Sequence, residues 1–294
     1  MDNKKTLNEI GIKYAIMAVI VLCVQFFSAF LLKKYNMEWL KENVVFASYI
    51  LSIVCNDFLA LLIILVLTKN MPKCNFPKRK LGVGNALTVY SISISIVLVG
   101  GLLGNFLQII ITGKVGNAAG DLISSGSNFI LGLVSVGIIA PVFEELVFRK
   151  ILIDRLGMSG KYISAVVSGL FFGLFHGNLS QFFFAACLGF LFSSVYIRTG
   201  RIIYTILFHM AINMPSAIIS NISTNAMAMY SLYMLLMAFV GFFMLFMKLD
   251  FIRLRKIDEQ EGNTDVKVYK TVFTSWGVWA FITVCAVVFY LTYS

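Results

Sequence analysis

Long apolar segments dominate this chain and restrict how it can fold. An α-helix needs about 20 predominantly apolar residues to cross the hydrocarbon core of a bilayer. A backbone surrounded by lipid must also satisfy its own hydrogen bonds, so such segments fold as helices. Nine candidate spans divide the 294 residues, at positions 12–32, 44–67, 84–111, 126–148, 161–177, 180–197, 202–220, 227–247 and 272–292. The sequence therefore predicts an all-α, polytopic transmembrane helix bundle with eight or nine spans.

The composition excludes an ordinary soluble domain. Hydrophobic residues make up 59% of the chain and charged residues only 13%, whereas soluble domains carry about 25% charged residues. The formal net charge of +10 raises the question of a nucleic-acid partner. No basic run interleaved with aromatic residues supports one, and loops held at the cytoplasmic face by Lys and Arg explain the charge better. We therefore expect membrane lipids as partners and no nucleic acid.

The distribution of Lys and Arg predicts the orientation in the membrane. If the N-terminus is cytoplasmic and all nine segments cross, 20 of the 24 basic residues lie in cytoplasmic segments. Cytoplasmic loops of membrane proteins carry such an excess. The expected location is thus the cell membrane, with the N-terminus cytoplasmic and the C-terminus outside. An eight-span arrangement stays open if the last helix is an appendage or one early segment does not cross.

The polar segments and the cysteines predict little chemistry of their own. The basic loop 68–83 is expected to rest on anionic headgroups, and residues 248–271 to form a solvated cytoplasmic linker. No two cysteines form a CxxC pair, so we expect neither a disulfide framework nor a zinc site. The five cysteines are Cys23, Cys55, Cys74, Cys187 and Cys285.

Three ionisable residues that could take part in catalysis occur close together in the fourth span. Glu144, Glu145 and Arg149 follow Pro141 in the segment PVFEELVFRK. Glu145 and Arg149 are four residues apart and share a helix face, where an ordinary ion pair is one interpretation. Glu144 is rotated by about 100° from Glu145, so the two carboxylates can hold different roles. Pro141 should loosen the helix just before them.

Two later spans contain both histidines of the chain. His176 lies in the fifth span, and His209 shares a face of the seventh span with Asn213. Each residue alone could be hydrogen-bonded glue between helices. Ionisable residues at membrane depth indicate function by default. Together with the glutamates they predict a catalytic site within the bilayer.

This set of groups fits the hydrolysis of a peptide bond. A buried glutamate can act as general base on water, with a histidine beside it. A second histidine and an asparagine amide can donate to a developing oxyanion. A zinc site formed by His176, His209 and a glutamate is the competing interpretation. The chain has no HExxH motif, and asparagine is a poor zinc ligand, so we expect no cofactor while a divalent metal stays open.

At these residues the chain resembles the CAAX protease and bacteriocin-processing (Abi, or CPBP) family of intramembrane proteases, and in particular the type II CAAX prenyl endopeptidases. Three family motifs occur in order over about residues 126–220. The EExxxR motif is Glu144, Glu145 and Arg149, the FxxxH motif is Phe172 and His176, and the HxxxN motif is His209 and Asn213. One departure is Lys150, where members often carry glycine; we expect an effect on packing or headgroup contact.

The resemblance implies a bundle with a cytoplasm-facing intramembrane cavity and a metal-independent glutamate protease. It implies that Glu144 activates water with help from His176, and that His209 and Asn213 form the oxyanion hole. Glu145, Arg149 and Phe172 would support the site. The chain then divides into N-terminal transmembrane helices at 1–125, a CAAX protease-like catalytic core at 126–220, and C-terminal transmembrane helices with a cytoplasmic linker at 221–294.

The substrate does not follow from the sequence, and two other functions stay open. We expect a small membrane-associated peptide or protein, possibly lipidated, since bacterial relatives are linked to peptide maturation and bacteriocin self-immunity. A non-catalytic scaffold would use the same fold to bind an envelope protein partner. A transporter is the third alternative, for which Asp57, near the middle of the second span, is the best indication.

Overall fold

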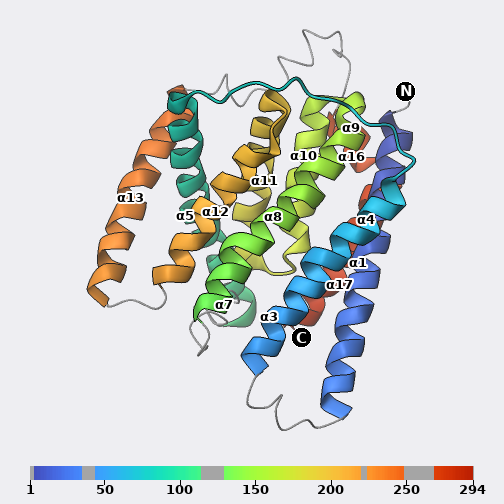
Figure 1. Ribbon diagram of the computed structural model, residues 1–294, viewed down its shortest axis with the longest axis horizontal. Coiled ribbons are helices and arrows are strands. Elements are labelled where there is room, and N and C mark those ends of the chain that lie inside the picture. Colours follow the sequence, from blue (N-terminus) through green and yellow to red (C-terminus); the bar gives the residue numbers. More distant parts are fainter. Residues whose placement is uncertain (1–2, 35–43, 114–128, 220–223, 248–267, 294) are drawn as a thin grey trace.

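The computed structural model describes residues 3–34, 44–113, 129–219, 224–247 and 268–293, and the elements of these residues are all helical (Figure 1). The elements are α1 (Asn3–Lys34), α3 (Val44–Ser52), η1 (Ile53–Leu59), α4 (Ala60–Thr68), α5 (Val83–Thr112), α7 (Phe129–Val134), η2 (Ser135–Ile139), α8 (Ala140–Glu145), η3 (Leu146–Ile151), α9 (Leu152–Leu156), η4 (Gly157–Ser159), α10 (Lys161–Phe175), α11 (Leu179–Thr199), α12 (Ile202–Ile219), α13 (Thr224–Met247), α16 (Val268–Phe273) and α17 (Trp276–Tyr293). The predicted polytopic helix bundle is confirmed.

Every predicted span corresponds to a helix or to a run of joined helical segments. In the described residues, seven helices are long and apolar enough to cross a membrane, and two shorter apolar helices lie at Lys161–Phe175 and Ile202–Pro215. Figure 1 shows α1 beginning and α17 ending at opposite ends of the bundle. Most of the predicted linker 248–271 lies outside the described residues.

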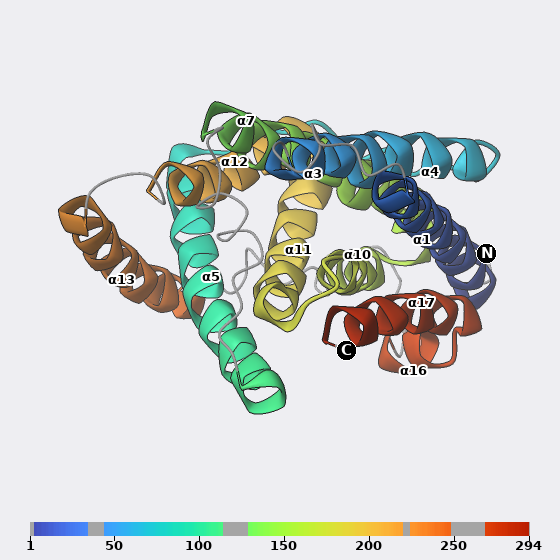
Figure 2. The same cartoon turned by 90° about the horizontal axis from the view of Figure 1, so that it is seen from below.

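Helices α10 and α11 lie in the middle of the bundle, between α5 on one side and α1 and α17 on the other (Figure 2). Their close approach depends on small residues. A Cβ atom at Gly169 would lie 2.6 Å from the carbonyl oxygen of Ala186 on α11, so only glycine fits there. Small residues at helix crossings let backbones approach in membranes, where hydrophobic attraction between helices is weak. This packing fixes the position of α10, which ends next to His176.

The first and last helices belong to the same core as the central ones. The buried rings of Tyr14 on α1, Phe171 on α10 and Phe281 on α17 contact one another, with Phe171 and Phe281 stacked at 4.1 Å between centroids. A Cβ atom at Gly11 would lie 2.3 Å from the carbonyl carbon of Gly277, so α1 and α17 touch backbone to backbone. The ninth helix is therefore an integral part of the bundle and not an appendage.

Three π-helical segments interrupt the second and fourth spans. They are η1, η2 and η3, and the last two flank α8 on both sides. A π turn widens the helix and is frequent at functional sites. At η2 the backbone N–H of Ala140 donates to Ser135 five residues earlier. Pro141 follows and has no N–H, so the carbonyl of Val136 loses the donor that would continue the pattern.

An extended segment between α4 and α5 crosses the end of the bundle where α1 begins (Figure 1). Its backbone is tied down at two points, because Cys74 N–H donates to Asp154 O at 2.6 Å and Arg79 N–H donates to Thr199 O at 2.8 Å. Phe76 is buried against Tyr196 with 5.7 Å between ring centroids. Its basic residues, Lys73, Lys78, Arg79 and Lys80, are exposed. The headgroup contact expected for this loop stays a prediction.

Candidate active site

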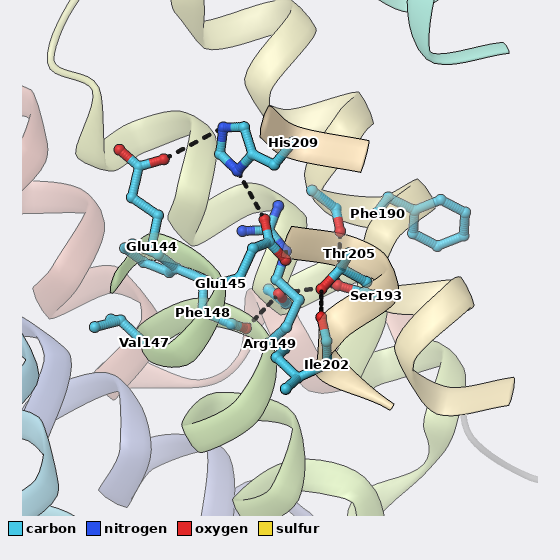
Figure 3. Close-up of polar contacts among 12 residues, drawn as sticks. Glu144, Glu145, Val147, Phe148, Arg149, Phe190, Ser193, Ile202, Thr205 and His209 are labelled. Atoms are coloured by element: carbon cyan, nitrogen blue, oxygen red, sulfur yellow. Dashed lines mark hydrogen bonds and ion pairs between the residues drawn. The ribbon is translucent and has the colours of Figure 1, made fainter. Parts of the chain in front are cut away.

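The fourth span, α10 and α12 bring the predicted catalytic residues to one region of the bundle. Glu144 and Glu145 end α8, and Arg149 lies in the following η3. His176 caps the C-terminus of α10, whereas His209 and Asn213 lie on α12. Figure 3 shows the side chains of both glutamates, Arg149 and His209 gathered between these elements. The spans that carry these residues therefore meet in the bundle, as predicted from the sequence.

Glu145 and Arg149 form a fully buried ion pair. Arg149 Nε lies 3.2 Å from Glu145 Oε2, and both side chains have 0% exposure. The guanidinium also stacks on Phe172, with 4.1 Å from Cζ to the ring centroid. No hydrogen-bond acceptor within the described structure reaches its Nη1 or Nη2 atom. The aromatic face therefore supplies part of the stabilisation that a buried cation requires.

His209 connects the two glutamates through its two ring nitrogens (Figure 3). Its Nδ1 lies 3.0 Å from Glu145 Oε1, and its Nε2 lies 3.5 Å from Glu144 Oε2. Because Glu145 is paired with Arg149, its carboxylate is the acceptor and His209 Nδ1–H is the donor. The other ring nitrogen, His209 Nε2, is then directed at Glu144.

The two adjacent glutamate side chains differ in exposure, and this difference limits the role that each can hold. The Glu144 side chain is 23% exposed, whereas Glu145 is 0% and His209 is 6% exposed. Glu144 therefore lies partly at the surface of the bundle, whereas Glu145 is enclosed. The sequence predicts that the two carboxylates point in different directions. The rotation between successive helix residues produces this difference in burial.

His176 joins the site through Phe172 and not through a direct contact with Glu144. The Phe172 ring packs edge-on against His176 at 4.7 Å and against His209 at 5.7 Å. His176 Nδ1 lies 2.8 Å from the carbonyl oxygen of Phe172. Since a carbonyl only accepts, Nδ1 carries the proton and Nε2 keeps its lone pair in the neutral ring. The motif phenylalanine is thus the contact that holds both histidines and Arg149.

Asn213 satisfies the carbonyl that Pro141 leaves without a donor. Its Nδ2 donates to Val136 O at 3.1 Å. This contact replaces the backbone hydrogen bond that a non-proline residue at position 141 would make in the π-helical pattern. One amide proton of Asn213 therefore has a structural partner, and its role as an oxyanion donor stays a prediction.

A chain of serine hydroxyls near the site was not identified from the sequence. Ser193 on α11 donates to Ser168 on α10 at 2.9 Å, and Ser168 donates to the carbonyl of Phe148 in η3 at 2.7 Å. On the other side of η3, the Tyr14 hydroxyl donates to Val147 O. Polar side chains inside spans were the available signal. These bonds hold the π segment that carries Arg149.

Lys150 contacts neighbouring elements, as its place after the motif arginine suggested. Its Nζ donates to Asp154 Oδ2 at 2.5 Å and to the Tyr196 hydroxyl at 2.9 Å. Tyr196 in turn donates to Asp154 Oδ1 at 2.7 Å. Lys150, at the position where members of the family often carry glycine, therefore links the fourth span to α11 through side-chain packing.

Metal-binding geometry is not seen in the parts of the chain that the structure describes. Over these residues, no three His, Cys, Asp or Glu side chains are placed to hold one metal ion. The competing zinc interpretation required two histidines and a glutamate around a single point. Both histidines pack edge-on against the Phe172 ring. The expectation of no cofactor stays a prediction.

Comparison with known proteins agrees with the motif order. Residues 126–215 match a family model described as type II CAAX prenyl endopeptidase Rce1-like. A Bacillus subtilis (strain 168) protein described as "Putative membrane peptidase YdiL" is 31% identical over 84 residues, which is 28% of this chain and 34% of that protein. No solved structure matches the chain. The resemblance to the CAAX protease family is thereby confirmed over residues 126–215, and the match spans about a third of the curated relative.

Proposed function

We propose that the protein is an intramembrane endopeptidase that uses Glu144 to activate water. The observation that carries the proposal is the contact of His209 with both glutamates, which leaves Glu144 as the exposed carboxylate. The family match over residues 126–215 supports the same reaction class, since its description names an endopeptidase. A scaffold has no need for a partly exposed carboxylate beside a histidine.

The reaction can be written with the residues of this chain alone. Glu144 removes a proton from water as the oxygen attacks the peptide carbonyl. His209, protonated between Glu144 and Glu145, donates through Nε2 to the oxyanion, and Asn213 adds its amide. Glu144 then passes the proton to the departing amine. Glu145 and Arg149 do not touch the substrate; they hold His209 in place and stabilise its positive charge. His176 Nε2 can accept a hydrogen bond from the attacking water.

The substrate class that fits is a membrane-associated peptide or protein. The site is built from helices of a membrane bundle, so a soluble substrate would have to enter the bilayer region. The matched family is described as a CAAX prenyl endopeptidase, which favours a lipidated chain. Bacteriocin maturation and self-immunity are processes that would use such a peptide. The proposed orientation, with a cytoplasmic N-terminus, makes the basic segment 69–82 cytoplasmic.

The test compares wild type with Glu144→Gln at matched membrane levels in a deletion host. Membrane and secreted peptides are profiled by mass spectrometry. We expect new peptide termini with wild type and none with Glu144→Gln. Glu9→Gln is the matched control, because Glu9 is a 47% exposed helical glutamate far from the site. Identical profiles for wild type and Glu144→Gln, with both rescuing the deletion phenotype, would refute the protease and favour the scaffold.

A further inference from the structure

The turn between α10 and α11 carries His176, and the buried side chain of Asn178 holds it from within. Gly177 has a φ of 66° and follows the C-cap of α10, and Asn178 is the N-cap residue of α11. Asn178 Nδ2 donates to the carbonyl oxygen of His176 at 2.9 Å and to Gln181 Oε1 at 2.7 Å. Its Oδ1 accepts from the backbone N–H of Gln181 at 3.0 Å. One amide group therefore joins the end of the helix that carries His176 to the start of the next helix.

These contacts exceed what the capping of α11 requires. An N-cap side chain needs an oxygen that accepts from a backbone N–H in the first turn of the helix. Asn178 Oδ1 supplies this oxygen through its contact with Gln181. The amide nitrogen takes no part in the capping, and its hydrogen bond to the His176 carbonyl instead holds the backbone of the histidine.

The ninth span holds the same turn from outside, where α17 packs beside α10 (Figure 2). The backbone N–H of Leu179 donates to the Tyr293 hydroxyl of α17 at 2.7 Å. A Cβ atom at Gly177 would lie 2.7 Å from Cγ1 of Val288, also on α17. The backbone on both sides of the asparagine is thus in contact with a helix that the family match does not include.

The direction of the His176 ring depends on this backbone. Its Nδ1 lies 2.8 Å from the carbonyl oxygen of Phe172, and its ring packs edge-on against the Phe172 ring. Both contacts join the last position of α10 to the preceding helical turn, and helix ends fray unless neighbouring groups hold them. If the turn after His176 loosened, the ring would leave the Phe172 carbonyl. The direction of Nε2 is therefore set by Phe172 on one side and by the turn on the other.

We propose that Asn178 and Tyr293 are positioning residues of the active site, which fix the backbone of His176 and so set the direction of its Nε2. The inference rests on the proposed function for its catalytic meaning, because His176 Nε2 is the atom that accepts from the attacking water. The placement of the ring does not depend on that function. A displacement of about 1 Å in a catalytic group can slow a reaction by about 100-fold. The ninth span would then serve the site as well as the core.

The experiment observes the His176 ring directly and needs no substrate. The chain contains two histidines, so the full-length protein with isotopically labelled histidine shows two imidazole rings by nitrogen NMR in lipid nanodiscs. His176→Gln assigns the signals. In wild type we expect His176 to carry its proton on Nδ1, bonded to the Phe172 carbonyl. A ring that leaves this carbonyl is no longer held in one tautomer, so both tautomers become populated.

Asn178→Ser separates the contact with His176 from the capping of α11. Serine caps helices about as well as asparagine, so an oxygen still accepts from the Gln181 N–H. The shorter side chain ends before the position of Nδ2 and loses the His176 carbonyl. We expect signals of both His176 tautomers in this variant. Ser180→Ala is the matched control, since it removes one hydrogen bond to Asn178 Oδ1 and leaves Nδ2 in place.

Tyr293→Phe loosens the turn from the side of the ninth span. It keeps the aromatic ring and removes the hydroxyl that accepts from Leu179 N–H, so we expect the same change in the His176 signals. Tyr290→Phe is the matched control, because Tyr290 is 72% exposed on the same helix. The ring of His209 is an internal reference, held by its own contact with the buried glutamate, and should not change.

Either variant is a sufficient test if the other does not fold. A folded Asn178→Ser or Tyr293→Phe protein with wild-type His176 signals would overturn the proposal. An equal change in Ser180→Ala or Tyr290→Phe would also overturn it, since the ring would then respond to any substitution nearby.

A second measurement ties the position of the ring to the reaction. Once a substrate is known, kcat should fall by about 10- to 100-fold in both positioning variants. KM should stay unchanged, because His176 acts on the water and not on the peptide. Altered His176 signals with an unchanged kcat would overturn the positioning role. Altered His176 signals in a protein whose wild type cleaves nothing would refute only the proposed function.

Discussion

His209 Nδ1 lies 3.0 Å from Glu145 Oε1, although the two residues are 64 positions apart in the chain. Glu145 is in turn paired with Arg149 in the interior of the bundle. This contact gives the second motif glutamate a definite task, because it fixes the tautomer and the orientation of the histidine. In the proposed mechanism, Glu144 performs the chemistry beside the other ring nitrogen. The adjacent glutamates of the motif thus act on opposite sides of one imidazole.

Replacing His209 should abolish cleavage without unfolding the protein. His209→Gln keeps a polar side chain beside Glu145 but cannot carry a positive charge toward the oxyanion. We expect a loss of about 100-fold or more in cleavage rate, as for removal of an oxyanion donor. The rate is measured on the peptide identified by mass spectrometry, in vesicles with matched amounts of protein. A rate within a few-fold of wild type would show that His209 has only a structural role.

Removing one partner of the buried ion pair should destabilise the fold more than removing both charges. Arg149→Met leaves the Glu145 carboxylate uncompensated in the interior, which costs about 3–5 kcal/mol. The double variant Glu145→Gln, Arg149→Met removes both charges and should recover a large part of this loss. Thermal unfolding in detergent compares wild type, the single variants Arg149→Met and Glu145→Gln, and the double variant. Additive losses in the double variant would contradict a direct interaction between the two charges.

The hydrogen bond between Asn213 and Val136 predicts that a second substitution can restore the stability lost on replacing Asn213. Asn213→Ala leaves the Val136 carbonyl without a donor, at a cost of about 1–3 kcal/mol. Pro141→Ala restores a backbone N–H at the position that can donate to that carbonyl. The unfolding temperature of the double variant should therefore exceed that of Asn213→Ala alone. Cleavage should not recover if Asn213 also serves the oxyanion, so stability and rate are measured together.

The backbone contact between α1 and α17 should not tolerate a larger side chain. A Cβ atom at Gly277 would lie 2.1 Å from the carbonyl oxygen of Asn8. Gly277→Leu should force the helices apart and lower the free energy of unfolding by about 1–3 kcal/mol or more. Gly84→Leu is the matched control, since a Cβ there meets nothing within 4 Å. Equal melting temperatures for both variants would show that the ninth helix is dispensable for the core.

The sequence alone determined the class of the molecule and the candidate residues of its site. Hydropathy is a local property, so each apolar segment identified its own helix. The motif order brought Glu144, Glu145, His176, His209 and Asn213 together as candidates, and the family match covers all of them. The predicted division at residues 125 and 220 stays a prediction, while the core packs side chains from all three sections together.

Only the tertiary structure decided which partner each polar group takes. Helical periodicity placed Glu145 and Arg149 on one face, but it could not reveal that His209 completes the contact from α12. It also gave no reason to pack η1 of the second span against α8 of the fourth. Contacts between distant spans depend on how closely backbones approach. That approach is set by small residues such as Gly169 and by π turns, whose effect appears only when neighbouring helices are in place.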